Sequence, residues 1–278
     1  MPPFFTIITS TYNAAATLPH LLDSLASQTC RDFNWIVQDG ASSDATMQIV
    51  EQYRDCLPEI LADSGKDSGI YDAWNKAIDR WQDKMGEWVL FLGADDKLAS
   101  EDILAKVQKE IYYFPKTTIF AAGDIILSNE YGNLNSYFKA PSNTIAFKRK
   151  FYTMPFPHTG LFTRRSSIQK KFDTGFHIAG DYDFILREFQ SPSQLKNINF
   201  FITHMGYGGI STTPDNNHLA KREMGLAIKK HSYFRFILFK SKQFKNYSFK
   251  VIKNNLLRSD FGTKIFFILK SIKNKFLK

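Results

Sequence analysis

The sequence has little cysteine and no long hydrophobic run. Cys30 and Cys56 are the two cysteines among 278 residues. They are too few for a disulfide framework and lack the spacing of a metal site, so we expect both to be buried thiols in a reducing compartment. No apolar run approaches the roughly 18 residues that a membrane-spanning helix needs. No basic segment or cleavage site precedes the strand-like start of the chain, which argues against a secretory signal.

Two nucleotide-binding fingerprints are also absent. The sequence contains neither a Gly-x-Gly-x-x-Gly motif nor a Walker lysine motif, so the dinucleotide-binding and P-loop classes lack support. Apolar material is ample, because 44% of the residues are hydrophobic. That content can build one large or two modest domains.

Acidic residues are nearly absent from the C-terminal part of the chain. From Lys229 onward there are 14 Lys and Arg against one acid, Asp260, which gives +13, whereas the first 228 residues hold 22 against 26, which gives −4. Such an asymmetry indicates an anionic partner, either a membrane surface or nucleic acid.

Within this tail, apolar and basic residues recur at helical spacing. The apolar positions are Phe261, Ile265, Ile268, Leu269, Ile272 and Phe276, and the lysines beside them are Lys264, Lys270, Lys273, Lys275 and Lys278. The pattern is typical of a helix that lies on anionic lipid. The alternative is a helical pair packed on the rest of the protein. Nucleic-acid binding is not expected, because no recognised motif accompanies the charge.

The first hundred residues alternate between strand and helix patterns. Predicted strands cover residues 4–9, 33–38, 60–61 and 88–92, and predicted helices cover 15–28, 44–54 and 69–81. This alternation indicates right-handed βαβ units and a parallel sheet. Later predictions are a helix over 101–112, a hairpin that starts at 118–127, an irregular loop over 140–157, strands at 159–163 and 198–203, and a helix that contains 181–187.

Two adjacent carboxylates, Asp95 and Asp96, follow the apolar run at residues 88–92. In open α/β sheets, ligands bind at the carboxyl ends of strands. A carboxylate pair there suits a divalent cation that is shared with phosphate oxygens. The alternative is an ordinary turn, because Gly-Ala-Asp-Asp is favourable turn chemistry.

Two further polar segments should lie at the same edge of the sheet. Thr11 and Tyr12 end the first predicted strand, and Asp39 ends the second. Asp39 can accept a hydrogen bond from a ribose or a base, with a glycine and small hydroxyl residues after it. We expect Asp44 to cap the following helix.

A third unusual segment covers residues 63–76. Two glycines bracket Lys66 and Asp67, and the next helix places Asp72 and Lys76 four residues apart, where an ion pair explains them. That ion pair does not explain Asp67 and Tyr71.

Four segments together, residues 6–13, 38–44, 67–77 and 93–96, resemble family 2 nucleotide-sugar glycosyltransferases in order and spacing. The resemblance extends over about residues 4–212. It implies the α/β GT-A fold, a Rossmann-like and mostly parallel sheet with flanking helices. The expected domains are 1–212, with a nucleotide-binding half (1–99) and an acceptor-side half (100–212), and a basic tail of amphipathic helices at 213–278.

The resemblance also implies roles at the nucleotide. Thr11 and Tyr12 would line the nucleoside pocket, Asp39 would hold the base or ribose, and Asp67 would contact the uracil side. His158 would face the acceptor or the donor phosphate, although a lone histidine is often structural. The segment 206–211 resembles one that closes over the site, with a plain loop as the alternative.

The metal motif of such enzymes corresponds to Asp95 and Asp96. Asp96 would be the direct ligand to Mn²⁺ or Mg²⁺, and Asp95 would lie nearer the ribose or donor sugar. The motif is often written Asp-x-Asp, and Ala94 stands here at its first position.

The resemblance places the general base at Asp181, where Gly180 replaces the glutamate that often precedes it. The literal Asp-x-Asp at 181–183 lies on a predicted helix, where residues two apart do not share a face. We therefore expect Asp183 to be a surface acid that faces Arg187.

The resemblance thus implies an inverting transfer of a hexose from a UDP-sugar to an acceptor hydroxyl. The expected acceptor is a polyprenyl-diphosphate-linked sugar in bacterial surface polysaccharide synthesis, O-antigen or capsule, at the inner face of the cytoplasmic membrane. One alternative is a sugar nucleotidyltransferase, which would normally show a Gly-rich loop with a basic residue after the first strand. The other is a non-enzymatic membrane- or nucleic-acid-binding protein.

Overall fold

The computed structural model describes residues 1–128, 136–206 and 216–241. The chain divides into two compact units, Met1–Ala227 and Ile228–Lys278. The predicted boundary after residue 212 and the predicted tail helix from Phe261 onward lie outside the described residues, and both stay predictions.

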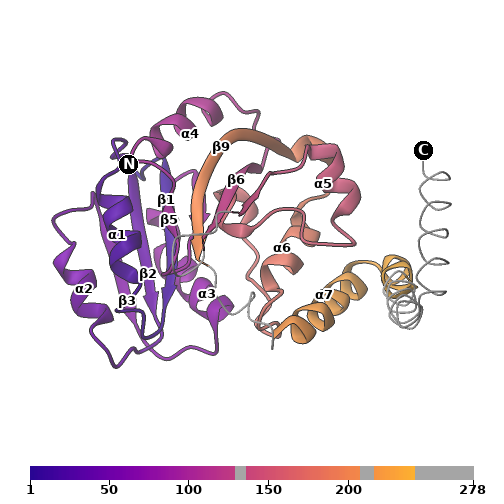
Figure 1. Cartoon of the computed structure of the whole chain (residues 1–278), viewed down its shortest axis with the longest axis horizontal. Helices are drawn as coiled ribbons and strands as arrows, with labels where there is room; N and C mark the ends of the chain where they lie inside the picture. Colours follow the sequence, from indigo (N-terminus) through magenta and orange to yellow (C-terminus); the bar gives the residue numbers. More distant parts are fainter. Residues whose placement is uncertain (129–135, 207–215, 242–278) are drawn as a thin grey trace, which may run out of the picture. The chain divides into compact units, whose positions relative to one another are not determined.

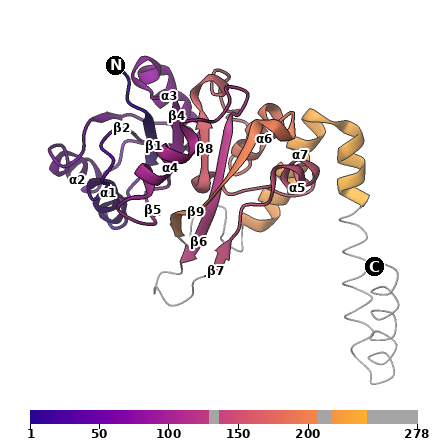
Figure 2. The same cartoon turned by 90° about the horizontal axis from the view of Figure 1, so that it is seen from above.

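A single sheet forms the centre of the first unit (Figures 1 and 2). Its strands in the described ranges are β1 (Phe5–Thr11), β2 (Phe33–Asp39), β3 (Ile60–Ser64), β4 (Trp88–Phe91), β5 (Lys97–Leu98), β6 (Phe120–Ser128), β7 (Ser136–Phe138), β8 (Leu161–Arg164) and β9 (Leu195–Gly206). The order is β3-β2-β1-β4-β8-β6-β9-β5, and β7 pairs with β6.

The sheet is mixed and mostly parallel, as the sequence predicts. Strands β3, β2, β1 and β4 are parallel, β8 is antiparallel to both of its neighbours, and β6 runs parallel to β9. The register of β1 and β2 pairs Thr11 with Asp39, so the polar segments after these strands meet at one edge. Figure 1 shows β9 as a long, bent strand.

Helices pack on both faces of the sheet. The helices of the described ranges are α1 (Leu18–Ala26), α2 (Thr46–Gln52), α3 (Ile70–Trp81), α4 (Ile103–Ile111), α5 (Asn143–Arg149), α6 (Gly180–Glu188) and α7 (Asn217–His231), with short 3₁₀ turns η1 (Gln82–Lys84), η2 (His158–Gly160), η3 (Arg165–Ser167) and η4 (Pro192–Gln194). Leu21 of α1 and Leu104 of α4 join Ile7 of β1 in one apolar cluster. From α3, Trp74 packs on Phe91 of β4.

This two-sided packing explains the apolar run at residues 88–92. Every residue of β4 is buried, as expected for a strand that is covered on both faces. The hairpin prediction is confirmed by the antiparallel pairing of β6 and β7, although its turn lies outside the described residues.

Two predictions about local structure are wrong, and one strand was not predicted. The expected irregular loop over 140–157 contains helix α5, whose last turn carries Lys148 and Arg149, charges that suit a helix C-terminus. Strand β5 has only two residues and so offers no periodicity to detect. Cys56 is exposed in the turn after α2, whereas Cys30 is buried and both are free thiols.

None of the helices in the described ranges combines the length and apolar character that a bilayer crossing requires.

Candidate active site

The first part of the site is the paired ends of β1 and β2, where Asp39 is completely buried. Its carboxylate accepts from the Thr11 hydroxyl (2.9 Å), the Ser64 hydroxyl (2.7 Å), and both the hydroxyl (2.5 Å) and the N–H (2.9 Å) of Ser42. Burial by itself would raise the pKa of Asp39, but the hydrogen bonds from Ser42, Ser64 and Thr11 outweigh it and hold the pKa below its usual value. Asp39 therefore organises the loops around it, and its contact with a nucleoside stays a prediction.

The two loops after these strands hold each other in place. The N–H of Asn13 donates to the Ser42 hydroxyl (2.8 Å), and the N–H of Ser43 donates to the Asn13 side chain (2.9 Å). Asn13 and Ala41 have positive φ angles of 49° and 62°. Such left-handed conformations in residues other than glycine are uncommon and often occur at functional sites.

Asp44 links the same two loops instead of occupying the N-cap of α2. That helix begins at Thr46 with Ala45 at its N-cap position. The Asp44 carboxylate accepts from the N–H groups of Ala15 and Thr46, each at 3.0 Å. The prediction of a simple N-cap is therefore corrected to a bridge between loops.

Tyr12 and Asp67 meet above Gly40. A Cβ atom on Gly40 would lie 2.9 Å from Oδ2 of Asp67 and 3.3 Å from Cδ2 of Tyr12, so a larger residue here would displace the Asp67 carboxylate. Tyr12 is exposed, and Asp67 is half-buried and accepts from the N–H of Gly69 (2.9 Å). The structure thus brings together Thr11, Tyr12, Asp39 and Asp67, which come from separate segments.

Of two predictions for acidic residues on helices, the one for Asp72 is confirmed and the one for Asp183 is wrong. Asp72 and Lys76 form the expected ion pair at 3.0 Å. Asp183, expected at the surface, is fully buried, because α6 has apolar neighbours on nearly every side. Arg187 donates to Glu188 at 2.6 Å.

The acid pair follows β4 at the same edge as Thr11 and Asp39. Asp95 is exposed, whereas Asp96 is only 2% exposed and accepts from the N–H of Gly93 (2.7 Å). A Cβ atom on Gly206, at the end of β9, would lie 2.6 Å from Oδ2 of Asp95, so β9 closely approaches the pair. Burial, followed by the charge of Asp95, raises the pKa of Asp96 to about 7.

The acid pair fits a divalent cation. In the described ranges, no Lys or Arg forms an ion pair with Asp95 or Asp96, and no group of three or more His, Cys, Asp or Glu residues is placed to hold a metal. Two hard oxygen ligands without an ion-pair partner match a magnesium-like ion whose other ligands are water and substrate phosphates. Which carboxylate binds the ion directly stays a prediction.

Asp181 is half-buried in the first turn of α6. Its Oδ1 accepts from the Tyr71 hydroxyl (3.2 Å) and from the N–H of Tyr182 (2.7 Å). Burial outweighs these hydrogen bonds and raises the pKa of Asp181 to about 6. A carboxylate with a pKa near neutrality suits general-base catalysis.

His158 is buried among aromatic rings. It stacks on Trp74 with ring centroids 5.2 Å apart, and Phe91 and Phe172 also contact it. Neither ring nitrogen has a hydrogen-bond partner among the described residues. Burial lowers the pKa of His158 to about 3, so the ring is neutral. Its expected contact with a phosphate or acceptor stays a prediction.

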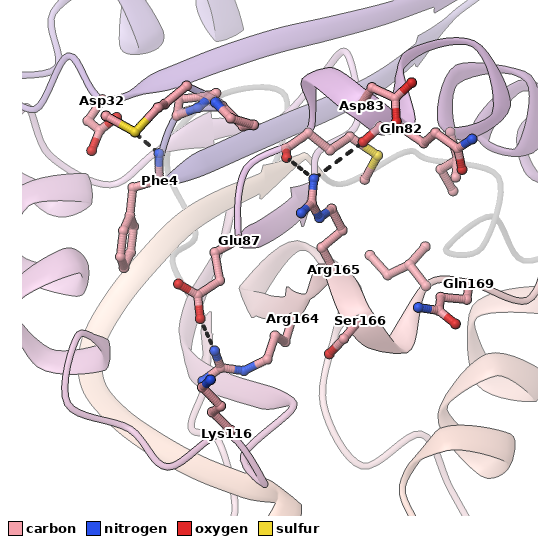
Figure 3. Close-up of a pocket in the computed structure, with 16 residues that line it drawn as sticks. Phe4, Asp32, Gln82, Asp83, Glu87, Lys116, Arg164, Arg165, Ser166 and Gln169 are labelled. Carbon is pink, nitrogen blue, oxygen red and sulfur yellow. Dashed lines mark hydrogen bonds and ion pairs between the residues drawn. The ribbon is translucent and has the colours of Figure 1, made fainter.

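A separate hollow of about 990 Å³ lies at the opposite edge of the sheet (Figure 3). Phe4, Asp32 and Glu87, which line it, directly precede β1, β2 and β4. Arg164 in its wall is paired with Glu87, and Arg165 donates to backbone carbonyls. The hollow is lined by none of the residues that the sequence predicts for the site.

The sequence matches the family described as Glycosyl transferase family 2 over residues 6–172. A PGL/p-HBAD biosynthesis glycosyltransferase of Mycobacterium bovis is 32% identical over 226 residues, which cover 79% of this chain and 84% of the relative. The putative teichuronic acid biosynthesis glycosyltransferase TuaG of Bacillus subtilis is 27% identical over 144 residues, 51% of this chain and 54% of TuaG.

Solved structures share the fold. S. aureus TarS 1–349 in complex with UDP-GlcNAc gives a TM-score of 0.63 at 22% identity, over 82% of this chain and 67% of that one. In the longer TarS structure, the match covers 40% of the TarS chain. The mannosyltransferase PcManGT from Pyrobaculum calidifontis, in complex with GDP-Man and Mn²⁺, gives 0.57 at 17% identity, over 83% and 63% of the two chains. Identities this low support the fold alone.

Proposed function

The chain is a member of glycosyltransferase family 2, and we propose that it transfers a hexose from a UDP-sugar to an acceptor hydroxyl with inversion at the anomeric carbon. One observation supports this proposal most directly. Asp181 stands at the start of α6, in a partly buried position that raises its pKa to about 6. A carboxylate in that state can accept a proton near neutral pH, as an inverting transferase requires.

In the proposed reaction, Asp181 takes the proton from the acceptor hydroxyl as its oxygen attacks the anomeric carbon. The bond from that carbon to the diphosphate oxygen breaks, and its electron pair leaves with UDP. Attack on the face opposite the leaving group inverts the configuration. Mn²⁺ or Mg²⁺, held by Asp96 together with Asp95, would neutralise charge on the departing diphosphate.

The donor would bind over the loops that follow β1, β2 and β3. Thr11 and Tyr12 would line the nucleoside pocket, with Asp39 at the base or ribose and Asp67 at the uracil side. The meeting of Tyr12 and Asp67 above Gly40 supports this placement. TarS, which shares the fold, has been solved with UDP-GlcNAc.

The acceptor would be a lipid-linked sugar in surface-glycan assembly. Two similar proteins are named as a PGL/p-HBAD biosynthesis glycosyltransferase and a putative teichuronic acid biosynthesis glycosyltransferase, which supports a role in glycan synthesis. In the described part of the second unit, Tyr233, Phe234 and Ile237 are exposed beside Arg235. Together with the +13 charge from Lys229 onward, they support peripheral attachment to the inner face of the cytoplasmic membrane.

The direct test incubates the full chain with Mn²⁺, a panel of UDP-sugars and a polyprenyl-diphosphate-sugar acceptor. We expect release of UDP and a glycoside whose anomeric configuration, read by NMR, is opposite to that of the donor. Release of pyrophosphate would instead indicate a nucleotidyltransferase. Retained configuration would exclude the single-displacement mechanism.

Asp96→Asn isolates the metal site, with Asp102→Asn as its matched control. Asp102 is a partly exposed acid that is paired with Lys106, so its loss should leave activity unchanged. Asp96→Asn should abolish both transfer and Mn²⁺-dependent UDP binding. Near-normal turnover that still requires Mn²⁺ would move the metal to other residues.

A further inference from the structure

The carboxylate of Asp181 is in contact with a side chain from another helix. The hydroxyl of Tyr71, on α3, lies 3.2 Å from Oδ1 of Asp181 and 2.6 Å from the carbonyl oxygen of Ile178. Tyr71 is only 4% exposed. Its single proton is therefore shared between a backbone carbonyl and the carboxylate, and both acceptors hold the hydroxyl in one place.

The ring of Tyr71 also occupies the space beside the backbone of α6. A Cβ atom on Gly180 would lie 2.7 Å from two carbons of that ring. The glycine directly before Asp181 therefore allows α3 and α6 to approach each other closely enough for the hydroxyl to reach the carboxylate.

A buried carboxylate from α7 holds the loop that leads into α6. Glu223 is 4% exposed, and its oxygens accept from the N–H groups of His177 (3.0 Å), Ile178 (2.8 Å) and Ala179 (3.0 Å). Helix α6 starts at the next residue, Gly180. Three consecutive donors on one carboxylate fix both the loop and the direction in which the helix begins.

We propose that Tyr71 and Glu223 are positioning residues for the general base Asp181. Glu223 fixes the loop at 177–179, the Ile178 carbonyl of that loop orients the Tyr71 hydroxyl, and the hydroxyl holds the carboxylate toward the acceptor. The inference rests on the proposed function, because it takes Asp181 as the base. A carboxylate that is held in one rotamer loses less orientational entropy when it takes the proton.

The hydrogen bond from Tyr71 also favours the ionised form of Asp181 and opposes the effect of burial on its pKa. The described titratable groups on the surrounding elements include Tyr71 on α3, Tyr182 and Asp183 on α6, His158 on η2 and Glu223 on α7. His158 is neutral because of its burial. Removal of the Tyr71 hydroxyl should therefore raise the pKa of Asp181.

The first experiment compares Tyr71→Phe with Tyr182→Phe in the full chain. Tyr182 is also buried, and Tyr182→Phe removes only its hydroxyl, which donates to the backbone carbonyl of Lys150, while the N–H that donates to Asp181 is kept. Both variants lose a buried hydroxyl, and thermal melting measures what each loss does to stability. Initial rates between pH 5 and 8, at saturating Mn²⁺, give kcat and the KM of the UDP-sugar.

For Tyr71→Phe we expect kcat to fall about tenfold, the scale of one hydrogen bond to a charged group, with the donor KM within about twofold of wild type. The acid limb of its pH profile should move to higher pH. Tyr182→Phe should keep the wild-type kcat and pH profile. If the two variants show the same kcat and the same profile, Tyr71 is merely structural and the proposal is overturned.

Glu223→Gln tests the other end of the network, and also carries the test if Tyr71→Phe does not fold. The new amide group would direct its own N–H donors at the backbone N–H donors of the loop at 177–179. The loop should therefore loosen, and kcat should fall without a matching rise in donor KM. Glu87→Gln, which removes a charge partner of Arg164 at the opposite edge, should leave both kcat and the donor KM unchanged. The double variant Tyr71→Phe/Glu223→Gln should lose less than the product of the single losses. Independent losses would overturn the network.

Asp181→Asn distinguishes the role of Asp181 as the base from the role of the positioning residues. If it retains turnover, the assignment of the base is wrong and this inference falls with it. If it loses turnover while Tyr71→Phe and Glu223→Gln behave like their controls, the base stands and only the positioning network is wrong.

Discussion

Asp39 and Asp181 are two carboxylates of the candidate site whose pKa values shift in opposite directions, although burial by itself would raise both. Asp39, in the nucleotide-binding half, accepts four hydrogen bonds, and its pKa lies below the usual value. Asp181, in the acceptor-side half, accepts two, and its pKa rises to about 6. Hydrogen bonds outweigh burial at Asp39, and burial outweighs hydrogen bonds at Asp181. In the proposed function, the first carboxylate maintains the shape of the site and the second takes a proton.

The largest expected effect comes from removing the poised carboxylate. Asp181→Asn should lower turnover by about 100-fold or more, the usual scale for loss of a general base. UDP and Mn²⁺ affinities, measured by calorimetry, should stay close to wild type, because Asp181 does not hold the donor in this assignment. A drop in UDP affinity as large as the drop in turnover would place Asp181 in the donor site.

The next effect is the pH dependence of the wild-type enzyme. Asp181 acts in its ionised form, so kcat/KM should rise as pH rises through about 6. At pH 5 the rate should be about tenfold below its plateau, because about one carboxyl group in ten is then ionised. Saturating Mn²⁺ keeps the metal site loaded in this measurement. A flat profile between pH 5 and 8 would contradict the role of Asp181.

Asp39→Asn should break the other side of the comparison. The amide group would leave at least one of its buried donors without an acceptor, at a cost of about 1–3 kcal/mol in the free energy of unfolding. Urea unfolding measures this cost, and Asp102→Asn serves as the surface control. The donor KM should rise by several-fold while kcat stays near wild type.

The same variant has a pH signature. Because folding lowers the pKa of Asp39, its carboxylate contributes stability at neutral pH that is lost as pH falls through that lowered pKa. The stability gap between wild type and Asp39→Asn should therefore be widest at pH 7 and narrow below about pH 4. A gap that is independent of pH would mean that the hydrogen bonds do not depend on the charge of Asp39.

The sequence predicts the nucleotide-binding half well, because its signals are local. The strands that end at Thr11 and Asp39 have plain apolar patterns, and parallel strands bring their ends to one edge. The acid pair after β4 is found in the same way. For each of these side chains, the strand that carries it, the neighbouring strand and the loop that follows are enough to specify where it lies.

The acceptor-side half is harder to predict, because its contacts join distant segments. Asp183 lies among consecutive buried residues in a helix that is covered all round, where amphipathic periodicity gives no signal. Glu223 stands beside Lys221 and Arg222, so its sequence context indicates a surface acid. Only the fold brings it to the backbone of the loop at 177–179.

The smallest expected effect tests the close approach of α3 and α6. Gly180→Ala places a methyl group 2.7 Å from the ring of Tyr71, at carbons that cannot move without the whole side chain. Alanine is favoured over glycine in a helix by about 1 kcal/mol, but overpacking costs about 1–3 kcal/mol. The net loss of stability should thus be about 1 kcal/mol, with kcat lowered by a few-fold as Tyr71 shifts. Gly175→Ala is the control, because its added Cβ would meet only the side chain of Asp173, with Oδ1 at 3.1 Å. If both variants keep the wild-type kcat, Asp181 tolerates movement of Tyr71. The difference between Asp39 and Asp181 then lies in their hydrogen bonds alone.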